Sequence, residues 1–406
     1  MLRRTLLPTT VLLLTTALLP TAAPFSAMAA KPRAARKPPA EPVETGSPAN
    51  TPVGPVDTAA RYGIVLDYNT NATLLDKEAD TAMAPSSMTK LMTAYVVYGL
   101  LKSGRLTLTQ TLPVSEAAWR MGGSKMFVQL DSAVKVEDLI RGMIVQSGND
   151  ACIVLAEGIS GSEAQFVELM NAKARELGLT KSTFRNSTGW PDPEHRMSAR
   201  DIATLARRII QDFPQYYRYD SERTFRYNNI EQPNRNTLVQ KGIADGLKTG
   251  HTDEGGFGLA VSAERGGRRV IVVLNGMTSM RQRGEEGERL LDWAFREFED
   301  VRLFTAGDTV EDAPVWLGDA RTVPLVGGRA LVATLPRNWR THAKIAIEYT
   351  SPLPAPIARG TNVGRLVITG EGVPEMSVPL LAGADVGRLG LPGRAFAVLS
   401  RMVGGG

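Results

Sequence analysis

The chain has 406 residues, a formal net charge of +5 at neutral pH, and 43% hydrophobic against 22% charged residues. These values are ordinary for a globular protein of two or three domains, and the small net charge argues against a nucleic-acid partner. The single cysteine, Cys152, excludes an intrachain disulfide, and the three histidines are too dispersed to form a zinc site. We therefore expect neither a metal nor another cofactor.

The first 29 residues have the features of a signal peptide. Two arginines precede an apolar run over residues 6–19, and Ala27-Met28-Ala29 has the small residues of a signal-peptidase site. The run is short for a membrane span and contains a proline, so we expect export to the periplasm or cell envelope. Residues 30–57 are rich in proline and alanine and are expected to form a disordered spacer.

The segment after the spacer predicts a hairpin that leads into a serine–lysine motif. Residues 61–67 and 73–75 have strand character, with a turn between them. Ser87 and Lys90 then stand three residues apart at the start of an apolar stretch typical of a helix. Residues three apart share one face of a helix, so a neutral Lys90 amine could take the proton of the Ser87 hydroxyl. For this motif alone, a serine-capped surface helix is the alternative.

A polar triplet, Ser147-Gly148-Asn149, interrupts the helical region downstream. Stretches with helical periodicity flank it at residues 136–145 and 150–159. Its side chains could point inward from a loop, or its serine or asparagine could simply cap a helix. Cys152 follows Asn149 by one helical turn, so we expect its thiol near that side chain, with a purely packing role as the alternative.

A third motif, Lys248-Thr249-Gly250, lies near the end of the same domain. The other elements of this region are expected over residues 163–177 and 199–211 (helices), 186–198 (an irregular loop), 256–263 and 270–274 (strands) and 285–298 (a helix). A glycine-containing turn over residues 122–125 is expected to be plain loop, with a place near the site as the alternative.

The composition changes after about residue 300. Short strand-like runs separated by glycine and proline predict an all-β domain over residues 301–391. The last residues, 392–406, could form a short amphipathic helix with weak membrane-surface association, or an ordinary terminal helix.

With Ser87-x-x-Lys90, Ser147-Gly148-Asn149 and Lys248-Thr249-Gly250 in order, the chain resembles low-molecular-mass penicillin-binding proteins of the D-alanyl-D-alanine carboxypeptidase family. The resemblance is strong over residues 58–300 and weaker over the β-rich region. It implies an α/β (α+β) penicillin-binding or serine β-lactamase-like transpeptidase fold, with an antiparallel sheet beside a helical lobe. A C-terminal β-sandwich is expected to follow.

The resemblance also implies roles in catalysis. Ser87 would attack the D-Ala-D-Ala bond at the end of a peptidoglycan stem peptide, and Lys90 would take its proton. Ser147 would pass a proton to the departing D-alanine, while Lys248 orients Ser147 and keeps Lys90 neutral. The backbone N–H groups of Ser87 and His251 would form the oxyanion hole.

Recognition of the substrate is implied for a second set of residues: Asn149, Lys248, Thr249, Gly250, His251 and Arg281. Asn149 would bind a substrate amide. Thr249 and an arginine would bind the terminal carboxylate, and Arg281 matches the family position better than Arg283. β-Lactam antibiotics are expected to be inhibitors, because they acylate the same serine.

Alternatives remain within and outside this family. The central glycine of Ser147-Gly148-Asn149, where class A β-lactamases have aspartate, fits the carboxypeptidases better. Glu194 lies in a loop where a deacylating carboxylate could sit, but its surroundings do not match the β-lactamase pattern. A D,D-endopeptidase, a β-lactamase and a non-catalytic peptidoglycan-binding protein are the other readings.

Overall fold

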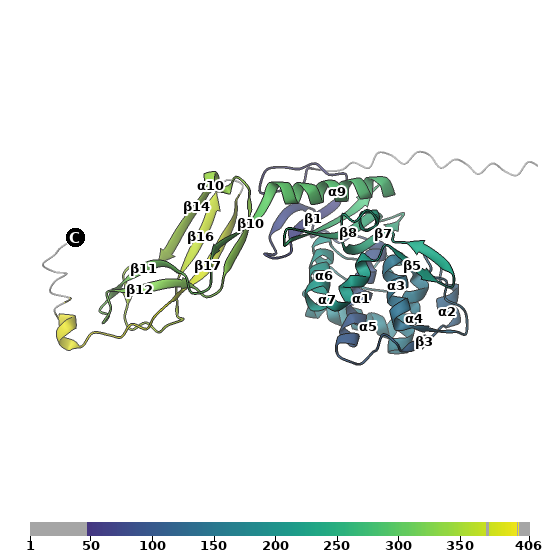
Figure 1. Ribbon diagram of the computed structural model, residues 1–406, viewed down its shortest axis with the longest axis horizontal. Helices are drawn as coiled ribbons and strands as arrows, with labels where there is room; N and C mark the ends of the chain where they lie inside the picture. The colour runs from purple at the N-terminus through teal and green to yellow at the C-terminus, as the bar shows by residue number, and fades with distance from the viewer. Residues whose placement is uncertain (1–46, 371–372, 396, 398–406) are drawn as a thin grey trace, which may run out of the picture. The chain divides into compact units, whose positions relative to one another are not determined.

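The computed structural model describes residues 47–370, 373–395 and 397 of the chain (Figure 1). The predicted signal peptide, the first part of the predicted spacer and most of the predicted C-terminal tail lie outside the described residues. In the described residues, buried apolar side chains form three clusters, two on the faces of one sheet and a third in the β-rich region.

A five-stranded antiparallel sheet organises the first part of the described chain. Its strand order is β2-β1-β9-β8-β7. The strands are β1 (Tyr62–Asp67), β2 (Thr73–Lys77), β7 (Gly246–Thr252), β8 (Gly256–Arg265) and β9 (Arg268–Met277). The helical region is therefore inserted between the second and third strands along the chain. β7 lies at the edge of the sheet, so one side of its backbone is not paired with another strand of this sheet.

Helices and two small hairpins fill the insertion and follow the sheet. They are η1 (Ser86–Thr89), α1 (Lys90–Lys102), α2 (Glu116–Arg120), α3 (Val136–Val145), α4 (Asn149–Ser160), α5 (Glu163–Glu176), α6 (Ala199–Asp212), α7 (Pro214–Tyr217), η2 (Arg218–Ser221), α8 (Thr237–Gln240), α9 (Met280–Glu297), and the hairpins β3 (Thr111–Pro113) with β4 (Ala133–Lys135) and β5 (Thr224–Tyr227) with β6 (Ile230–Pro233).

The alternation of side chains along the strands separates two cores. Ile64 and Leu66 pack with the helices of the insertion, whereas Val65 between them packs with α9 on the other face. Figure 1 shows α9 on one side of the strands and helices α1 to α7 on the other. The sheet is thus covered on both faces, and the expected antiparallel sheet with a helical lobe is confirmed.

A β-rich region follows α9 and has its own apolar core. One sheet pairs β10 (Phe298–Phe304) with β13 (Leu331–Pro336), and a six-stranded sheet has the order β14-β16-β17-β12-β11-β15. Its strands are β11 (Thr309–Trp316), β12 (Thr322–Gly327), β14 (Ala343–Tyr349), β15 (Leu353–Pro354), β16 (Asn362–Gly370) and β17 (Val373–Ala382), with a short α10 (Trp339–His342). The expected β-rich C-terminal region is therefore present.

The end of the predicted spacer differs from the expectation. Ala49 is fully buried against the sheet and exchanges backbone hydrogen bonds with Val56, and the Asn50 N–H donates to the Asp76 carbonyl over 2.8 Å. A small apolar side chain fits under the sheet edge here, so residues 49–56 belong to the folded part despite their proline-rich composition.

Two elements differ from the sequence prediction. Lys248-Thr249-Gly250 lies inside β7, a strand that was not predicted. α9 begins at Met280, because the Ser279 hydroxyl caps it by accepting the Gln282 N–H over 3.1 Å. The polar first turn hid this start from a reading based on apolar periodicity.

Candidate active site

Ser87 and Lys90 meet where η1 runs into α1. The Lys90 amine lies 2.9 Å from the Ser87 hydroxyl oxygen. Lys90 is fully buried, whereas Ser87 is only partly buried and can meet a ligand. The start of the helix therefore places an accessible serine hydroxyl next to a buried lysine amine, as the spacing of three residues predicted.

Three oxygen atoms surround the Lys90 amine. Besides the Ser87 hydroxyl, it contacts the Asn149 side-chain oxygen over 2.7 Å and the Thr188 backbone carbonyl over 2.6 Å. The last two oxygens can only accept hydrogen bonds. A neutral amine has two N–H donors and one lone pair, so these two acceptors leave the lone pair free to face the Ser87 hydroxyl. The geometry suits a lysine that acts as a base.

Burial supports the neutral form of this amine. Desolvation lowers the pKa of Lys90 to about 8, against weaker opposing effects of Cys152 and Asp150. The resemblance implied that repulsion from Lys248 would help to keep this amine neutral. Burial is the largest cause of the lowered pKa of Lys90, and the repulsion contributes to the pKa of Lys248, which lies well below its usual range.

The Ser147-Gly148-Asn149 turn lies between α3 and α4. Ser147 has a left-handed backbone (φ 63°) and is nearly buried, and its hydroxyl makes no hydrogen bond within the described part of the chain. Asn149 spans the site, because its amide nitrogen donates to the Gly122 carbonyl over 2.9 Å while its oxygen accepts from Lys90. In this structure Asn149 therefore positions Lys90, and its second oxygen lone pair and second N–H are not used by these two hydrogen bonds.

Packing explains the central glycine of this turn. A Cβ on Gly148 would lie 2.9 Å from the Asp150 carboxylate and 3.1 Å from the Gly142 carbonyl. Asp150 uses that position to accept the backbone N–H groups of Met126 and Phe127 over 2.9 and 2.8 Å. An aspartate in the middle of the triplet would collide with this anchor of the neighbouring loop.

β7 brings the third motif against Ser87. A Cβ on Gly250 would lie 3.0 Å from Ser86 Cβ and 3.3 Å from the Ser87 nitrogen, so glycine lets the strand pass close to the nucleophile. Lys248 and Thr249 are both buried, and the Lys248 amine contacts the Thr249 carbonyl over 3.1 Å. All three predicted motifs therefore converge on Ser87.

The outer end of β7 carries His251, whose exposed ring lies 4.0 Å from that of Phe257. The guanidinium carbon of Arg283 lies 5.9 Å from the centre of the same Phe257 ring. Arg283 is almost fully buried. Burial, followed by Arg235, lowers the pKa of Arg283 to about 10. Arg283, Arg235 and Lys248 are close enough for each arginine to lower the pKa of Lys248.

Arg281, our preferred carboxylate-binding residue, lies elsewhere. Its side chain is 85% exposed and pairs only with Glu285 one turn along α9, over 3.8 Å. Residues two apart point to different faces of a helix, so the register that buries Arg283 turns Arg281 to solvent. The structure brings Arg283, not Arg281, to the other site residues.

The loop over residues 186–195 is a part of the site that the sequence did not reveal. Thr188 supplies the carbonyl that accepts from Lys90, and the Asn186 side-chain oxygen holds the loop by accepting the N–H groups of Thr188, Gly189 and Trp190. Gly189 has φ +81°, and a Cβ there would overlap the Ser86 carbonyl. The asparagine, glycine and prolines of this loop were the sequence features that could have pointed to it, but such residues indicate only a turn.

His195 stabilises this loop through hydrogen bonds of both ring nitrogens and is not the base that activates Ser87. Its Nδ1 accepts the Arg185 N–H over 3.3 Å, and its Nε2 lies 2.9 Å from the Thr89 hydroxyl. Burial lowers the pKa of His195 to about 4, so the ring is neutral and Nε2–H donates to Thr89. The Glu194 side chain is exposed to solvent and pairs with Arg185 over 3.2 Å.

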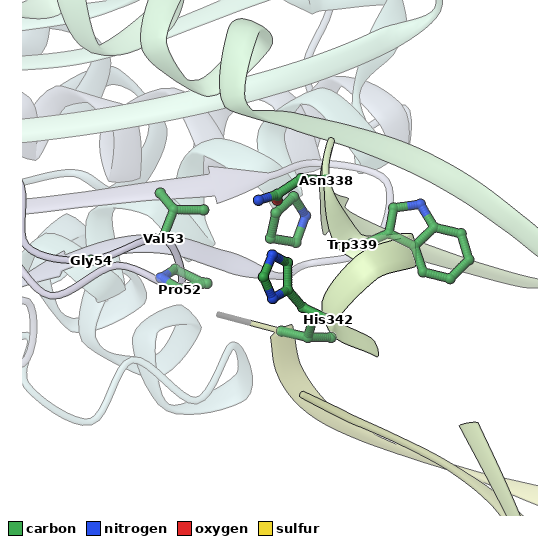
Figure 2. A pocket seen from close by; sticks show the side chains of 8 residues that line it. Pro52, Val53, Gly54, Asn338, Trp339 and His342 are labelled. Atoms are coloured by element: carbon green, nitrogen blue, oxygen red, sulfur yellow. The ribbon is translucent and has the colours of Figure 1, made fainter. Parts of the chain in front are cut away.

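We also searched the described residues for a second pocket, a metal site and a membrane-spanning helix. A pocket lined by Pro52, Val53, Gly54, Pro336, Asn338, Trp339, His342 and Val373 contains none of the predicted site residues (Figure 2). Over residues 47–370, 373–395 and 397, no group of His, Cys, Asp and Glu could hold a metal ion, and no helix is long and apolar enough to cross a membrane.

A reachable serine on a buried, neutral lysine, beside the edge strand of an antiparallel sheet, defines a serine hydrolase of the serine–lysine type. Comparisons agree. The family model of D-alanyl-D-alanine carboxypeptidases matches residues 48–278, and that of the penicillin-binding protein 5 C-terminal domain matches residues 298–388. The chain belongs to the D-alanyl-D-alanine carboxypeptidase family.

Individual relatives cover most of the chain. D-alanyl-D-alanine carboxypeptidase DacC of Escherichia coli is 40% identical over 76% of this chain and 79% of its own length. The structure of penicillin binding protein 5 from Haemophilus influenzae has a TM-score of 0.74 and 37% identity, covering 83% of this chain and all of that one. Penicillin-binding protein D2 from Listeria monocytogenes, solved in an ampicillin-bound form, has a TM-score of 0.55 and 27% identity, covering 60% and 99%.

Proposed function

We propose that the protein is a D-alanyl-D-alanine carboxypeptidase that removes the terminal D-alanine from peptidoglycan pentapeptides through an acyl-enzyme on Ser87. The observation that carries this proposal is the contact of 2.9 Å between Ser87 and a buried Lys90 whose other two acceptor contacts favour the neutral amine. Family membership supplies the substrate class, since its relatives are named for it.

Acylation begins when the Lys90 lone pair takes the Ser87 proton. The serine oxygen bonds to the carbonyl carbon of the scissile peptide, and the carbonyl electron pair moves onto its oxygen. The Ser87 backbone N–H and the neighbouring backbone of β7 at His251 would stabilise that oxyanion, since β7 passes close to the Ser87 nitrogen. Breaking the C–N bond then leaves the acyl group on Ser87.

The departing D-alanine amine needs a proton. Ser147 is suited to deliver it, because its hydroxyl is nearly buried and free of competing hydrogen bonds within the described chain. Lys248 would orient this hydroxyl from β7. Lys90 would then pass the proton that it took from Ser87 to Ser147, so that the amine is neutral again and Ser147 has its hydroxyl back. Water next attacks the acyl-enzyme, Lys90 takes one of its protons, and that proton goes to the Ser87 oxygen as the carboxyl product leaves.

A group of cations beside β7 would bind the substrate's terminal carboxylate. Arg235 and Arg283 each lower the pKa of Lys248, Arg235 also lowers the pKa of Arg283, and none of the three forms a salt bridge within the described residues. An incoming carboxylate would neutralise this unbalanced charge. We therefore assign carboxylate recognition to Arg283 with Thr249, in place of Arg281.

Location and domain roles follow from the same proposal. We propose that residues 1–29 direct export, that residues 58–300 are the catalytic domain, and that residues 301–391 hold the cleft towards the peptidoglycan. Residues 392–406 would associate weakly with the membrane surface.

The alternatives, a D,D-endopeptidase, a β-lactamase or an inactive peptidoglycan-binding protein, share this architecture. The exposed position of Glu194, paired with Arg185, gives no support to efficient β-lactamase activity.

Incubation with a pentapeptide ending in D-Ala-D-Ala, with free D-alanine as the readout, tests the proposal. We expect release by the wild-type protein and none by Ser87→Ala. Absence of release by the folded wild-type protein would overturn it. Cross-linked peptide dimers in a parallel assay decide between carboxypeptidase and endopeptidase.

A further inference from the structure

Asp220 is a buried carboxyl group that the proposed mechanism does not use. It lies in η2, it is fully buried, and neither of its carboxyl oxygens has a hydrogen-bond partner within the described residues. Burial of an unpaired carboxyl group lowers stability, because the group loses its hydration without a compensating contact. An unpaired acid inside the fold therefore calls for an explanation other than packing.

The consecutive short helices α7 and η2 place Asp220 alongside β7. Tyr217, three residues earlier, is anchored at the start of that strand, where its hydroxyl donates to the Asp245 carboxylate over 2.8 Å. A Cβ on Gly246 would lie 2.5 Å from the same hydroxyl. Residues three apart share one face of a helix, and η2 packs against β7. Asp220 is therefore next to the strand that carries Lys248.

Other charged groups around Asp220 already have partners. Asp245 forms a salt bridge with Arg269 over 2.6 Å, and Arg141 on α3 forms one with Glu222 over 2.8 Å. Lys248 is the lysine or arginine of the elements packed against η2 that forms no salt bridge within the described residues. The titratable groups of those elements are Glu137, Asp138 and Arg141 of α3, Tyr216 and Tyr217 of α7, and Lys248 and His251 of β7.

Burial acts in opposite directions on Asp220 and Lys248. It raises the pKa of Asp220 well above its usual value, and Asp245 adds to this rise, whereas Lys248 opposes it. The Lys248 amine is also buried, and burial, followed by repulsion from Lys90, holds its pKa well below the usual value. Each charged form is thus unfavourable by itself, and each stabilises the other.

We infer that Asp220 is a positioning residue that acts through Lys248: it is the internal counter-charge of this lysine and extends to higher pH the range over which Lys248 remains an ammonium group. When the pair holds one proton, its transfer from the Asp220 carboxyl to the Lys248 amine breaks an O–H bond, forms an N–H bond and leaves the net charge unchanged. The effect on catalysis rests on the proposed function, in which Lys248 is one of the cations that receive the terminal carboxylate.

An NMR titration of the Lys248 side chain, labelled with ¹³C at Cε and assigned with Lys248→Arg, tests this coupling. Asp220→Asn keeps the size of the side chain and removes its charge, so the pKa of Lys248 should fall by about one unit or more. Tyr98→Phe is the matched control, because it removes the unpartnered buried hydroxyl whose pKa Asp220 raises and changes no charge. It should leave the pKa of Lys248 unchanged. An unchanged pKa of Lys248 in Asp220→Asn would overturn the inference.

The wild-type protein supplies a second test that does not depend on the folding of a variant. Two interacting groups share their titration steps, so the Asp220 carboxyl, observed by ¹³C at Cγ, and the Lys248 amine should change at the same pH values. Independent titrations of the two groups would disprove the coupling.

Kinetics then distinguish this role from a purely structural one. With a pentapeptide ending in D-Ala-D-Ala, the KM of Asp220→Asn should match that of the wild type at low pH and begin to rise at a pH about one unit lower. A structural defect would change KM by the same factor at every pH, and that result would contradict the inference. If wild-type protein releases no D-alanine, the proposed function fails, while the NMR titrations still decide whether Asp220 and Lys248 are coupled.

Discussion

The Asn149 side-chain oxygen accepts a hydrogen bond from the Lys90 amine over 2.7 Å. This relationship joins the second motif to the first and gives Asn149 a task in addition to the one we expected. An amide oxygen can only accept, and it satisfies one N–H of the amine without adding negative charge. A neutral partner therefore holds the lysine in place while burial keeps its pKa low.

The first prediction concerns pH. Lys90 acts as a base only when unprotonated, and its pKa is lowered to about 8 by burial. The rate of Ser87 acylation should therefore rise about tenfold per pH unit below that value and level off above it. Stopped-flow acylation by a chromogenic β-lactam measures this directly. A rate that is flat from pH 6 to 9 would show that Lys90 is not the base.

A single substitution should displace this profile. Asn149→Asp would put a carboxylate next to the amine and raise the pKa of Lys90, because an adjacent negative charge favours the protonated form. Acylation at pH 7 should fall about tenfold or more, and the rise should move to higher pH. Asn149→Ala is the control: it removes the hydrogen bond without adding charge, so it should slow acylation without that displacement to higher pH.

The second prediction separates the two candidate arginines. Arg283→Ala should raise KM for D-alanine-terminated peptides by about tenfold or more, because the substrate carboxylate would lose its charged contact with the buried guanidinium. Arg281→Ala should have little effect, since that side chain is 85% exposed. Steady-state kinetics on one peptide is the measurement, and the opposite ranking would restore our original choice.

These two arginines also show which part of the site could not be predicted from the sequence. Ser87, Lys90 and the two later motifs could be found because chemistry fixes their residue types and spacing. The choice between Arg281 and Arg283 depends on the rotation of α9, whose polar first turn gave no periodicity to read. Sequence located the arginine pair, but only the fold shows which one is buried.

The loop contacts were beyond prediction for a different reason. Thr188 contributes a backbone carbonyl, which every residue possesses, so no residue type marks it. The Gly122–Gly123 turn was expected to be plain loop, yet the Gly122 carbonyl accepts from Asn149. The sheet and main helices were predictable from periodicity, whereas the short hairpins and the buried Ala49 depend on tertiary packing.

The third prediction addresses the glycine in Ser147-Gly148-Asn149. Gly148→Ala should lower stability by about 1–3 kcal/mol, because its Cβ would lie 2.9 Å from the Asp150 carboxylate. Gly99→Ala is the matched control in a helix, where the nearest atom to a new Cβ, on Phe213, is 3.8 Å away. Thermal unfolding of both variants decides the matter. Equal stability would mean that packing does not select this glycine.

The fourth prediction concerns Cys152. We expected its thiol near Asn149, and it lies fully buried with Sγ–H directed at the Gly148 carbonyl over 3.3 Å. Burial raises the pKa of this thiol to about 12, so almost no thiolate exists at neutral pH. Iodoacetamide should therefore not modify the folded protein, and Cys152→Ala should keep most activity. Rapid alkylation without unfolding, followed by mass spectrometry, would contradict this placement.

The most direct measurement of the central claim is the site of acylation by penicillin. After trapping and digestion, mass spectrometry should place the added mass on Ser87, with no adduct in Ser87→Ala. Lys90→Ala should stay folded and label far more slowly, because it keeps the nucleophile and loses the base. An adduct on the adjacent Ser86, or wild-type labelling of Lys90→Ala, would contradict the account.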